Sequence, residues 1–247
     1  TDPEFPPEVK SITKNTQHTH YESKFKNAPW VRAHEIVGVE KDQLKLFDKV
    51  DPNDISQGAL GVCYYLASLS ATAEFPKRLM SRFITKEANP HGLYSVALFD
   101  RGMPVEIVVD DKFPCYPDTK SALFTKPKGT EAWVMIMEKA FCKLHGSYTL
   151  PESGYSMKAL ENINGCPAEE LDNNDMEPEE NWKKIYEFDQ KKFIMTCSPR
   201  SGQNKSETGL VSGHAYTLIS AFEVEGVRLL RIRNPWGGGE WKGDYSD

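Results

Sequence analysis

The order of hydrophobic and polar positions predicts an open arm followed by helices and strands in the first half of the chain. Residues 6–50 are polar with scattered apolar side chains, a pattern typical of an extended arm that docks at a few points. After a glycine-bearing loop, Cys63 begins a segment with small and apolar residues at i, i+3, i+4 and i+7, the spacing of a packed helix. Two strands and a second helix are expected next, at residues 94–99, 105–110 and 131–144.

The second half of the chain has mostly strand patterns. Residues 146–154 contain Pro151 and two glycines, and this turn chemistry makes them the expected domain boundary. A short helix and three strands are expected beyond it, at residues 182–188, 192–197, 214–221 and 228–233. The fold class expected is therefore α+β, with a helical first lobe and a β-rich second lobe. The expected divisions are 1–27 (tag remnant and arm), 28–152 and 153–247.

Composition excludes several classes of protein. The 247 residues carry 30 basic and 36 acidic side chains, a net charge of −6, with no more than two adjacent basic residues, so no nucleic-acid partner is expected. The longest obvious apolar run, residues 132–137, is much shorter than the roughly 20 residues of a membrane helix. The first seven residues have no secretory-signal pattern, and the first five resemble a cloning-site remnant.

Cys63 is a candidate nucleophile. The five cysteines are an odd number without any Cys-x-x-Cys pair, which argues against a disulfide framework and favours a reducing, cytoplasmic location. Cys63 begins the expected helix, where a thiolate anion is favoured, and nearby glycines allow a ligand backbone to approach. The alternative for a cysteine is a small buried hydrophobe. That is our interpretation of the other four, Cys115, Cys142, Cys166 and Cys197.

His214 and Asn234 are candidate partners for this nucleophile. His214 enters an apolar strand, where a satisfied core histidine is the commoner alternative to a general base. Asn234 follows the last expected strand, and its amide could accept a hydrogen bond from the imidazole and fix the tautomer. The two residues lie 151 and 171 positions after Cys63. This chain order is that of papain-like peptidases, although the gaps are somewhat longer than those typical of papain.

Three blocks around these residues closely resemble the active-site blocks of the calpain cysteine-protease core. They are Gln57-Gly-Ala-Leu-Gly-Val-Cys63, Gly213-His-Ala-Tyr216 and Arg231-Ile-Arg-Asn-Pro-Trp-Gly237. Further matching segments extend the resemblance over about residues 28–247. The resemblance implies a papain-like core of two subdomains, the first with the nucleophile and the second with the histidine and asparagine.

The resemblance also implies a role for each residue of the site. Cys63 would be the nucleophile, His214 the general acid and base, and Asn234 the residue that orients the imidazole. Trp236 would shield the histidine–asparagine contact from water, and Gln57 would donate a side-chain N–H to the oxyanion. A donor preorganised over a developing oxyanion contributes about 3–4 kcal/mol in such sites.

Calcium is the cofactor that the resemblance implies, in a regulatory role that aligns the two subdomains. One site would use Asp54, Glu131 and backbone carbonyls near residues 49–51, and a second Glu240, Asp247 and the Trp236 loop. Two carboxylates with carbonyls and water suit an ion that takes about six to eight hard oxygens. The alternative for each of these acids is a solvated surface carboxylate.

Some positions depart from the family pattern. Val62 and Tyr64 stand where the family usually has aspartate and tryptophan, and Lys49 lies near a usual calcium-loop glycine. The expected function is a calcium-regulated intracellular cysteine endopeptidase that makes limited cuts in protein or peptide substrates. The alternative is a catalytically impaired calpain-like interaction or scaffolding module. One interpretation of the chain is a fragment of a larger calpain-like protein with further domains.

Overall fold

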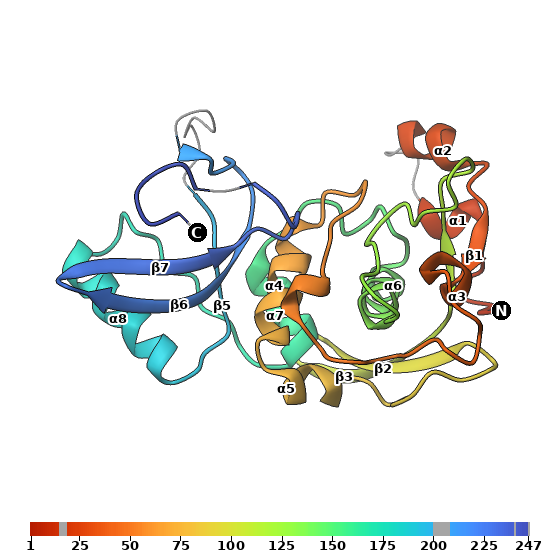
Figure 1. The fold of residues 1–247 in the computed structure, drawn as a ribbon, viewed down its shortest axis with the longest axis horizontal. Helices are drawn as coiled ribbons and strands as arrows, with labels where there is room; N and C mark the ends of the chain where they lie inside the picture. The colour runs from red at the N-terminus through yellow and green to blue at the C-terminus, as the bar shows by residue number, and fades with distance from the viewer. Residues whose placement is uncertain (15–18, 200–207, 240, 247) are drawn as a thin grey trace.

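The computed structural model describes residues 1–14, 19–199, 208–239 and 241–246, which form two lobes side by side (Figure 1). The first lobe contains most of the helices, and the second contains the last helix and the last three strands. This mixture of helices and antiparallel sheets confirms the predicted α+β fold class. Within the described ranges, no helix combines the length and the apolar character that crossing a membrane requires.

Two buried helices form the centre of the first lobe. Helix α4 (Cys63–Ala73) is made of small and apolar residues, and every side chain after Cys63 is buried. Helix α6 (Trp133–His145) lies in the middle of the lobe and is buried over residues 133–142 (Figure 1). It ends at Gly146, whose φ of 102° lies in the left-handed region that glycine adopts without a Cβ clash. Both of the helices predicted for this half of the chain are confirmed.

Two antiparallel strand pairs belong to the first lobe. Strand β2 (Leu93–Asp100) pairs with β3 (Met103–Asp110) through a two-residue turn, Arg101-Gly102. Both turn residues have positive φ, 50° and 79°, as the twist of a tight hairpin requires, and this hairpin confirms the predicted strands. The second pair, β1 (Trp30–Arg32) with β4 (Lys112–Pro114), was not predicted because three-residue strands carry no detectable period.

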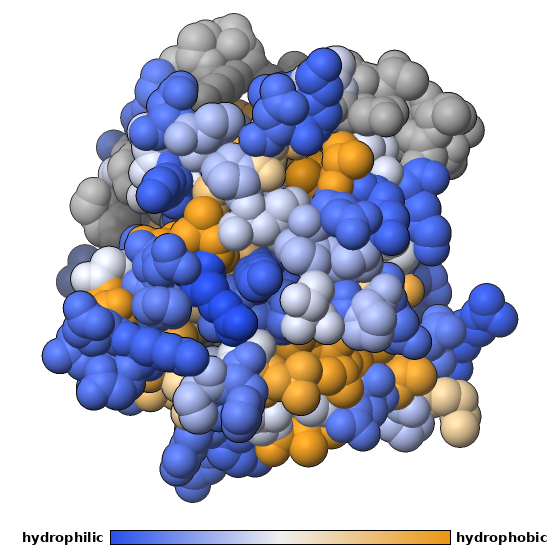
Figure 2. All heavy atoms as spheres, turned by 90° about the vertical axis from the view of Figure 1, so that its right-hand side faces the viewer, coloured by the Kyte–Doolittle hydropathy of each residue, from blue (hydrophilic) through white to orange (hydrophobic). Residues whose placement is uncertain are grey.

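Figure 2 looks at the end of the first lobe, from the right-hand side of Figure 1. Most of the surface in this view is hydrophilic, and apolar side chains gather in a band low on the face. Strands β2 and β3 contribute exposed apolar side chains to the surface of this lobe, at Leu93, Met103 and Val108. The hairpin therefore carries apolar surface that its own lobe does not bury.

Short helices complete the first lobe. They are α1 (Val9–Ile12), α2 (Thr19–Phe25), α3 (Ala33–Val37), the 3₁₀ turn Pro52–Asp54, α5 (Pro76–Ser81) and α7 (Ser156–Asn164). In α7, Asn164 Nδ2 donates to Thr72 Oγ1 of α4 at 3.2 Å, and Asn162 Nδ2 donates to the Phe99 carbonyl of β2 at 2.6 Å. The domain boundary expected between residues 152 and 153 comes before α7, yet α7 packs on α4 and β2. Helix α7 therefore packs with the first lobe, and the domain boundary between residues 152 and 153 stays a prediction.

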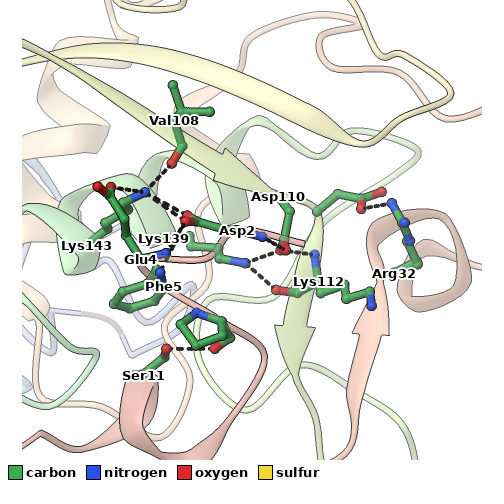
Figure 3. Close-up of polar contacts among 12 residues, drawn as sticks. Asp2, Glu4, Phe5, Ser11, Arg32, Val108, Asp110, Lys112, Lys139 and Lys143 are labelled. Atoms are coloured by element: carbon green, nitrogen blue, oxygen red, sulfur yellow. Dashed lines mark hydrogen bonds and ion pairs between the residues drawn. The ribbon is translucent and has the colours of Figure 1, made fainter.

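The N-terminal segment is integrated into the first lobe and is not a loosely docked arm. Phe5 and Phe25 are buried in its hydrophobic core. Asp2 is also buried: its backbone N–H donates to Asp110 Oδ2 at 2.8 Å, and its carboxylate accepts from Lys143 Nζ (Figure 3). Residues that resemble a cloning-site remnant in the sequence are therefore packed into the first lobe, and their origin stays a prediction. Irregularly spaced apolar residues gave no periodic signal for this packing.

The second lobe is built on a three-stranded antiparallel sheet in the order β5–β6–β7. The bounds of these strands are Met195–Cys197, Tyr216–Val224 and Val227–Arg233. Strand β6 turns into β7 at Glu225-Gly226, where both residues have positive φ, as a tight hairpin requires. The first residues of β6 are buried, whereas both strands become exposed toward the hairpin turn.

One helix, α8 (Pro178–Gln190), packs along β6 in the second lobe. Asp189 Oδ2 accepts a hydrogen bond from the Ala221 N–H at 3.3 Å across this contact. The helix begins earlier than the predicted residues 182–188, because Pro178 starts its first turn and Glu179 and Glu180 complement the N-terminal dipole there. These two glutamates end an acidic stretch at residues 169–180, so part of that stretch is the first turn of a helix.

Candidate active site

Cys63 is the first residue of α4, as the sequence predicted. Val62 precedes it as the N-cap residue and supplies no side-chain hydrogen bond to the helix. The first-turn N–H groups therefore have no side-chain acceptor from the cap, and a helix N-terminus of this kind favours an anion. Cys63 is half-buried, whereas the helix after it is completely buried. Its thiol is thus held by a rigid element and remains partly accessible.

The other cysteines lie in different settings. Burial raises the pKa of Cys115 to about 11 and that of Cys197 to about 12. Burial also raises the pKa of Cys142, which lies inside α6, well above its usual value. Cys166 is exposed, but it follows α7 and does not begin a helix. Only Cys63 among the five combines partial exposure with the first position of a helix.

His214 and Asn234 are in direct contact in the second lobe. His214 Nε2 lies 2.8 Å from Asn234 Oδ1. The same oxygen accepts from the Trp236 N–H at 3.1 Å, and Asn234 Nδ2 donates to the Gly238 carbonyl at 2.8 Å. These contacts fix which end of the amide faces the ring. Because an amide oxygen only accepts, Nε2 is the donor, and Nδ1 is the acceptor of the neutral imidazole.

Aromatic rings enclose the imidazole of His214. The Trp236 ring lies 4.2 Å from it between centroids, and the Tyr216 ring packs edge-on at 4.8 Å. His214 is only 3% exposed, whereas Trp236 is 40% exposed. The tryptophan therefore lies between the imidazole and solvent, where it limits the access of water to the His214–Asn234 bond.

Gln57 lies where the first lobe meets the Asn234 loop. Its backbone N–H donates to the Pro235 carbonyl at 3.2 Å, and its Nε2 donates to the Leu60 carbonyl at 2.8 Å. Its buried Oε1 has no hydrogen-bond partner among the described residues. The second N–H of the amide is not used by the Leu60 bond, so the side chain keeps a donor for a further acceptor near the start of α4.

Tyr64, one of the departures from the family pattern, packs into the first lobe. Its hydroxyl donates to the Pro151 carbonyl at 2.8 Å, and a Cβ on Gly154 would lie only 2.6 Å from its ring. The Ser153 N–H donates to the Gly61 carbonyl at 3.0 Å in the same region. The phenol therefore fastens the segment between α6 and α7 to the loop that precedes Cys63.

Asp54 and Glu131, the acids of the first expected calcium site, lie close enough to interact. Burial is the largest cause that raises the pKa of both carboxyl groups, and the Asp54 charge raises the pKa of Glu131 further. Glu131 Oε1 accepts from the Lys49 N–H at 3.2 Å, whereas its buried Oε2 has no partner among the described residues. A buried carboxylate oxygen of this kind fits a hard cation such as calcium.

Carboxylates alone do not complete a metal site here. Within the described part of the chain, no group of three or more His, Cys, Asp or Glu side chains is placed to hold a metal ion. A cation at Asp54 and Glu131 would need backbone oxygens as well, such as those expected near residues 49–51. Glu240 and Asp247, the acids of the second expected site, lie outside the residues that the structure describes.

Polar contacts between the lobes were not foreseen from the sequence. Arg233 binds Glu74 and Ser70 of α4, and Thr217 Oγ1 donates to the Ala67 carbonyl of the same helix at 2.8 Å. The only indication in the sequence was that Arg233 directly precedes Asn234 in the block Arg231–Gly237, which matches the family's active site. Nothing in the sequence indicated that its side chain reaches the other lobe.

A cysteine begins the buried helix of one lobe, and a histidine–asparagine pair lies in the sheet lobe beside it. This arrangement is that of a papain-like cysteine protease core. The model of the calpain family cysteine protease matches residues 1–247. The chain therefore belongs to the calpain family of cysteine proteases.

Curated relatives agree with this assignment. The chain is 35% identical to the calpain-type cysteine protease DEK1 of Arabidopsis thaliana, over all of this chain and 12% of that protein. It is 32% identical to the human calpain-2 catalytic subunit, over all of this chain and 36% of that protein. Human calpain-9 is 31% identical over 88% of this chain and 33% of its own length. The chain thus spans between about an eighth and a third of these relatives.

Proposed function

We propose that this chain is the catalytic core of a calcium-regulated cysteine endopeptidase that makes limited cuts in proteins. The observation that carries the proposal is the 2.8 Å contact between His214 and Asn234, covered by Trp236. This contact supports a proton on Nε2, and we take Nδ1 as the proposed acceptor of the thiol proton. Cys63 at the start of α4 is the thiol with the matching setting.

The reaction follows from these assignments. His214 Nδ1 takes the Cys63 proton, and the sulfur attacks the scissile carbonyl carbon, so that a C–S bond forms and the carbonyl electrons move to oxygen. As the oxyanion collapses, the C–N bond breaks, and the imidazolium gives its proton to the leaving amine. His214 then deprotonates a water molecule that attacks the thioester, which releases the acid product and restores the thiol.

Gln57 is proposed to stabilise the oxyanion. Its bond to the Leu60 carbonyl holds the amide beside the loop that leads to Cys63, and one N–H of Nε2 remains for the substrate oxygen. The backbone N–H of Cys63 is the second proposed donor. Donors fixed before the reaction need no reorganisation when charge develops on the oxygen.

Calcium is proposed to bind at Asp54 and Glu131. The unpartnered Oε2 of Glu131 and the raised pKa of both acids support this proposal, because a bound cation would compensate two carboxylates that burial otherwise disfavours. The ion would supply no reacting group and would tie the 3₁₀ turn Pro52–Asp54 to the start of α6. The second site, with Glu240 and Asp247, stays a prediction from the sequence.

The alternative function is an interaction or scaffolding module without activity. Hydrolysis of a disordered protein, measured with and without calcium and beside Cys63→Ala, separates the two functions. The protease proposal expects cleavage that calcium increases and that Cys63→Ala abolishes. Binding of the same protein without cleavage under any calcium concentration would favour the scaffolding alternative. Protein substrates, further domains and a cytoplasmic location are proposals for the longer protein to which the chain corresponds.

A further inference from the structure

Arg233 is the last residue of β7 and directly precedes Asn234. Its side chain leaves the second lobe and reaches three acceptors that belong to the first. Nη1 pairs with Glu74 Oε1 and lies 3.3 Å from Ser70 Oγ, while Nε donates to Asn53 Oδ1 at 3.1 Å. The arginine is about a fifth exposed and Glu74 about a quarter, so solvent screens this pair only partly.

The three acceptors belong to two separate elements of the first lobe. Ser70 lies in α4 and Glu74 caps its C-terminus, while Cys63 is the first residue of the same helix. Asn53 belongs to the 3₁₀ turn Pro52–Asp54, which is closed by reciprocal bonds between Asp51 and Asp54. One guanidinium therefore links the strand that leads to Asn234 with the helix that begins at Cys63 and with the turn that carries Asp54.

The sheet places a second contact beside this one. Thr217 pairs with Arg233 in the register of β6 and β7, and its hydroxyl donates to the buried Ala67 carbonyl of α4. His214 lies three residues before Thr217 on the same chain segment. Both segments that carry the histidine–asparagine pair are thus held against one helix, within a few residues of the pair itself.

The chemistry of the contact requires an arginine. A planar guanidinium presents several N–H donors in fixed directions, and here they serve acceptors on two elements at once. A lysine ammonium would keep the charge and the pairing with Glu74 but could not reproduce this fixed fork. An uncharged side chain of the same length would leave Glu74 without its partner and release Asn53.

We propose that Arg233 is a positioning residue. It holds Asn234, and through Asn234 the His214 imidazole, in the position relative to Cys63 that the reaction needs. This inference rests on the proposed protease function. A displacement of about 1 Å between reacting groups is enough to cost on the order of 100-fold in rate. Ser70 and Glu74 lie toward the end of α4 opposite Cys63, so the contact should act on the geometry of the reacting groups and change substrate binding little.

The test compares steady-state kinetics of Arg233→Met, Arg233→Lys and Glu74→Gln with those of the unaltered protein. Active enzyme is titrated in each sample with an epoxysuccinyl peptide, so that kcat is counted per reactive Cys63. We expect Arg233→Met to lower kcat about 10- to 100-fold with KM within about twofold. Arg233→Lys should recover part of the loss, and Glu74→Gln should lower kcat in the same direction.

Arg228→Met is the matched control, because Arg228 pairs with Glu179 and Glu223 inside the second lobe. It should leave kcat and KM unchanged. A kcat per titrated site that stays within twofold in both Arg233→Met and Glu74→Gln would overturn the proposal, as would an equal loss in Arg228→Met. If the unaltered protein neither cleaves protein nor reacts with the epoxide at Cys63, the proposed function itself fails, which is a different result.

Discussion

The two lobes differ in how they are held together. Nearly all of the buried hydrophobic cluster comes from the first lobe, between Phe5 and Ile163, and includes the interior of α4 and α6. From the second lobe the cluster includes Ala215, next to His214. Large apolar side chains of the β6–β7 hairpin remain exposed, such as Val224 at 51% and Leu230 at 44%. The nucleophile therefore sits on a deeply packed scaffold, and its partners sit on a thin sheet.

This difference in packing suggests that the first lobe mainly determines stability and that the contact between the lobes mainly determines catalytic geometry. A packed core keeps its shape because moving one side chain disturbs many neighbours. The thin sheet has fewer such constraints, so polar contacts with α4 add to the buried start of β6 in holding His214 and Asn234 in place. Changes inside the first lobe should therefore affect stability first, whereas changes at the lobe contact should affect catalysis first.

The largest expected effect is the loss of the nucleophile. Cys63→Ala should lower hydrolysis by at least about 1,000-fold, because no other group on the scaffold forms the covalent intermediate. The free energy of unfolding of this variant should change little, because Cys63 is half-buried and is the first residue of its helix. The measurement is cleavage of a disordered protein alongside thermal unfolding.

A labelling experiment supplies the control for Cys63. An epoxysuccinyl peptide should modify Cys63 alone. Burial raises the pKa of Cys115, Cys142 and Cys197, and the exposed Cys166 follows a helix and does not begin one. Mass spectrometry of the digested protein identifies the modified residue. Equal labelling of Cys115 or Cys197, or full activity in Cys63→Ala, would contradict the protease proposal.

A pair of apolar truncations tests the difference in packing. Ile136→Ala in α6 removes a completely buried side chain and should lower the free energy of unfolding by about 2–5 kcal/mol. Leu230→Ala in β7 removes a side chain that is 44% exposed and should cost no more than about 0.5 kcal/mol. Urea unfolding measures both. Similar losses for the two variants would mean that the lobes do not differ in the way described.

A buried acid gives the first lobe a pH dependence of its own. Burial raises the pKa of Glu138 in α6 to about 7, from about 4.5, although its Oε2 accepts a bond from the Thr125 N–H. Between these two values the folded state holds the proton more firmly than the unfolded state does. The free energy of unfolding should therefore fall by about 3 kcal/mol as the pH rises through this window.

The variant Glu138→Gln isolates this contribution. It retains an acceptor for Thr125 and cannot ionise, so it should be more stable than the unaltered protein at pH 8 and lack most of the fall between pH 5 and pH 8. Urea unfolding at the two pH values measures the change, with Glu87→Gln at an exposed acid as the control. An identical pH dependence in Glu138→Gln and the unaltered protein would show that Glu138 is not the responsible group.

The sequence predicted what depends on neighbouring residues and missed what depends on distant ones. The helix start at Cys63 and the two strands on either side of Arg101-Gly102 were predictable because periodicity is a local signal. The three sequence blocks also predicted that Asn234 orients the imidazole of His214, and the two side chains are in contact in the structure. The burial of Asp2 and the reach of Arg233 depend on residues more than 100 positions away, for which no local pattern exists.

The smallest expected effect is a change in calcium affinity, which compares the two predicted calcium sites. Asp54 and Glu131 both belong to the well-packed first lobe, and the second predicted site depends on Glu240 and Asp247, which lie outside the described residues. Because the charge and number of oxygen ligands set calcium affinity, and a preformed site costs less to order, the first site should bind more tightly. Asp54→Asn combined with Glu131→Gln should weaken the main calcium-binding event about tenfold or more in titration calorimetry.

Glu240→Ala should change the main calcium-binding event little. Asp175→Asn, in the acidic stretch before α8, is the control for a general loss of negative charge. The folded state of each variant is checked by thermal unfolding without calcium. Removing the buried Glu131 carboxylate and the half-buried Asp54 carboxylate, whose charges repel each other, should not destabilise the protein. If Glu240→Ala removed the main binding event instead, the tighter site would belong to the second lobe. In that case Lys49, which lies near a usual calcium-loop glycine of the family, would be the residue to change next. Its backbone N–H already occupies Glu131 Oε1, and its positive charge would oppose a cation nearby.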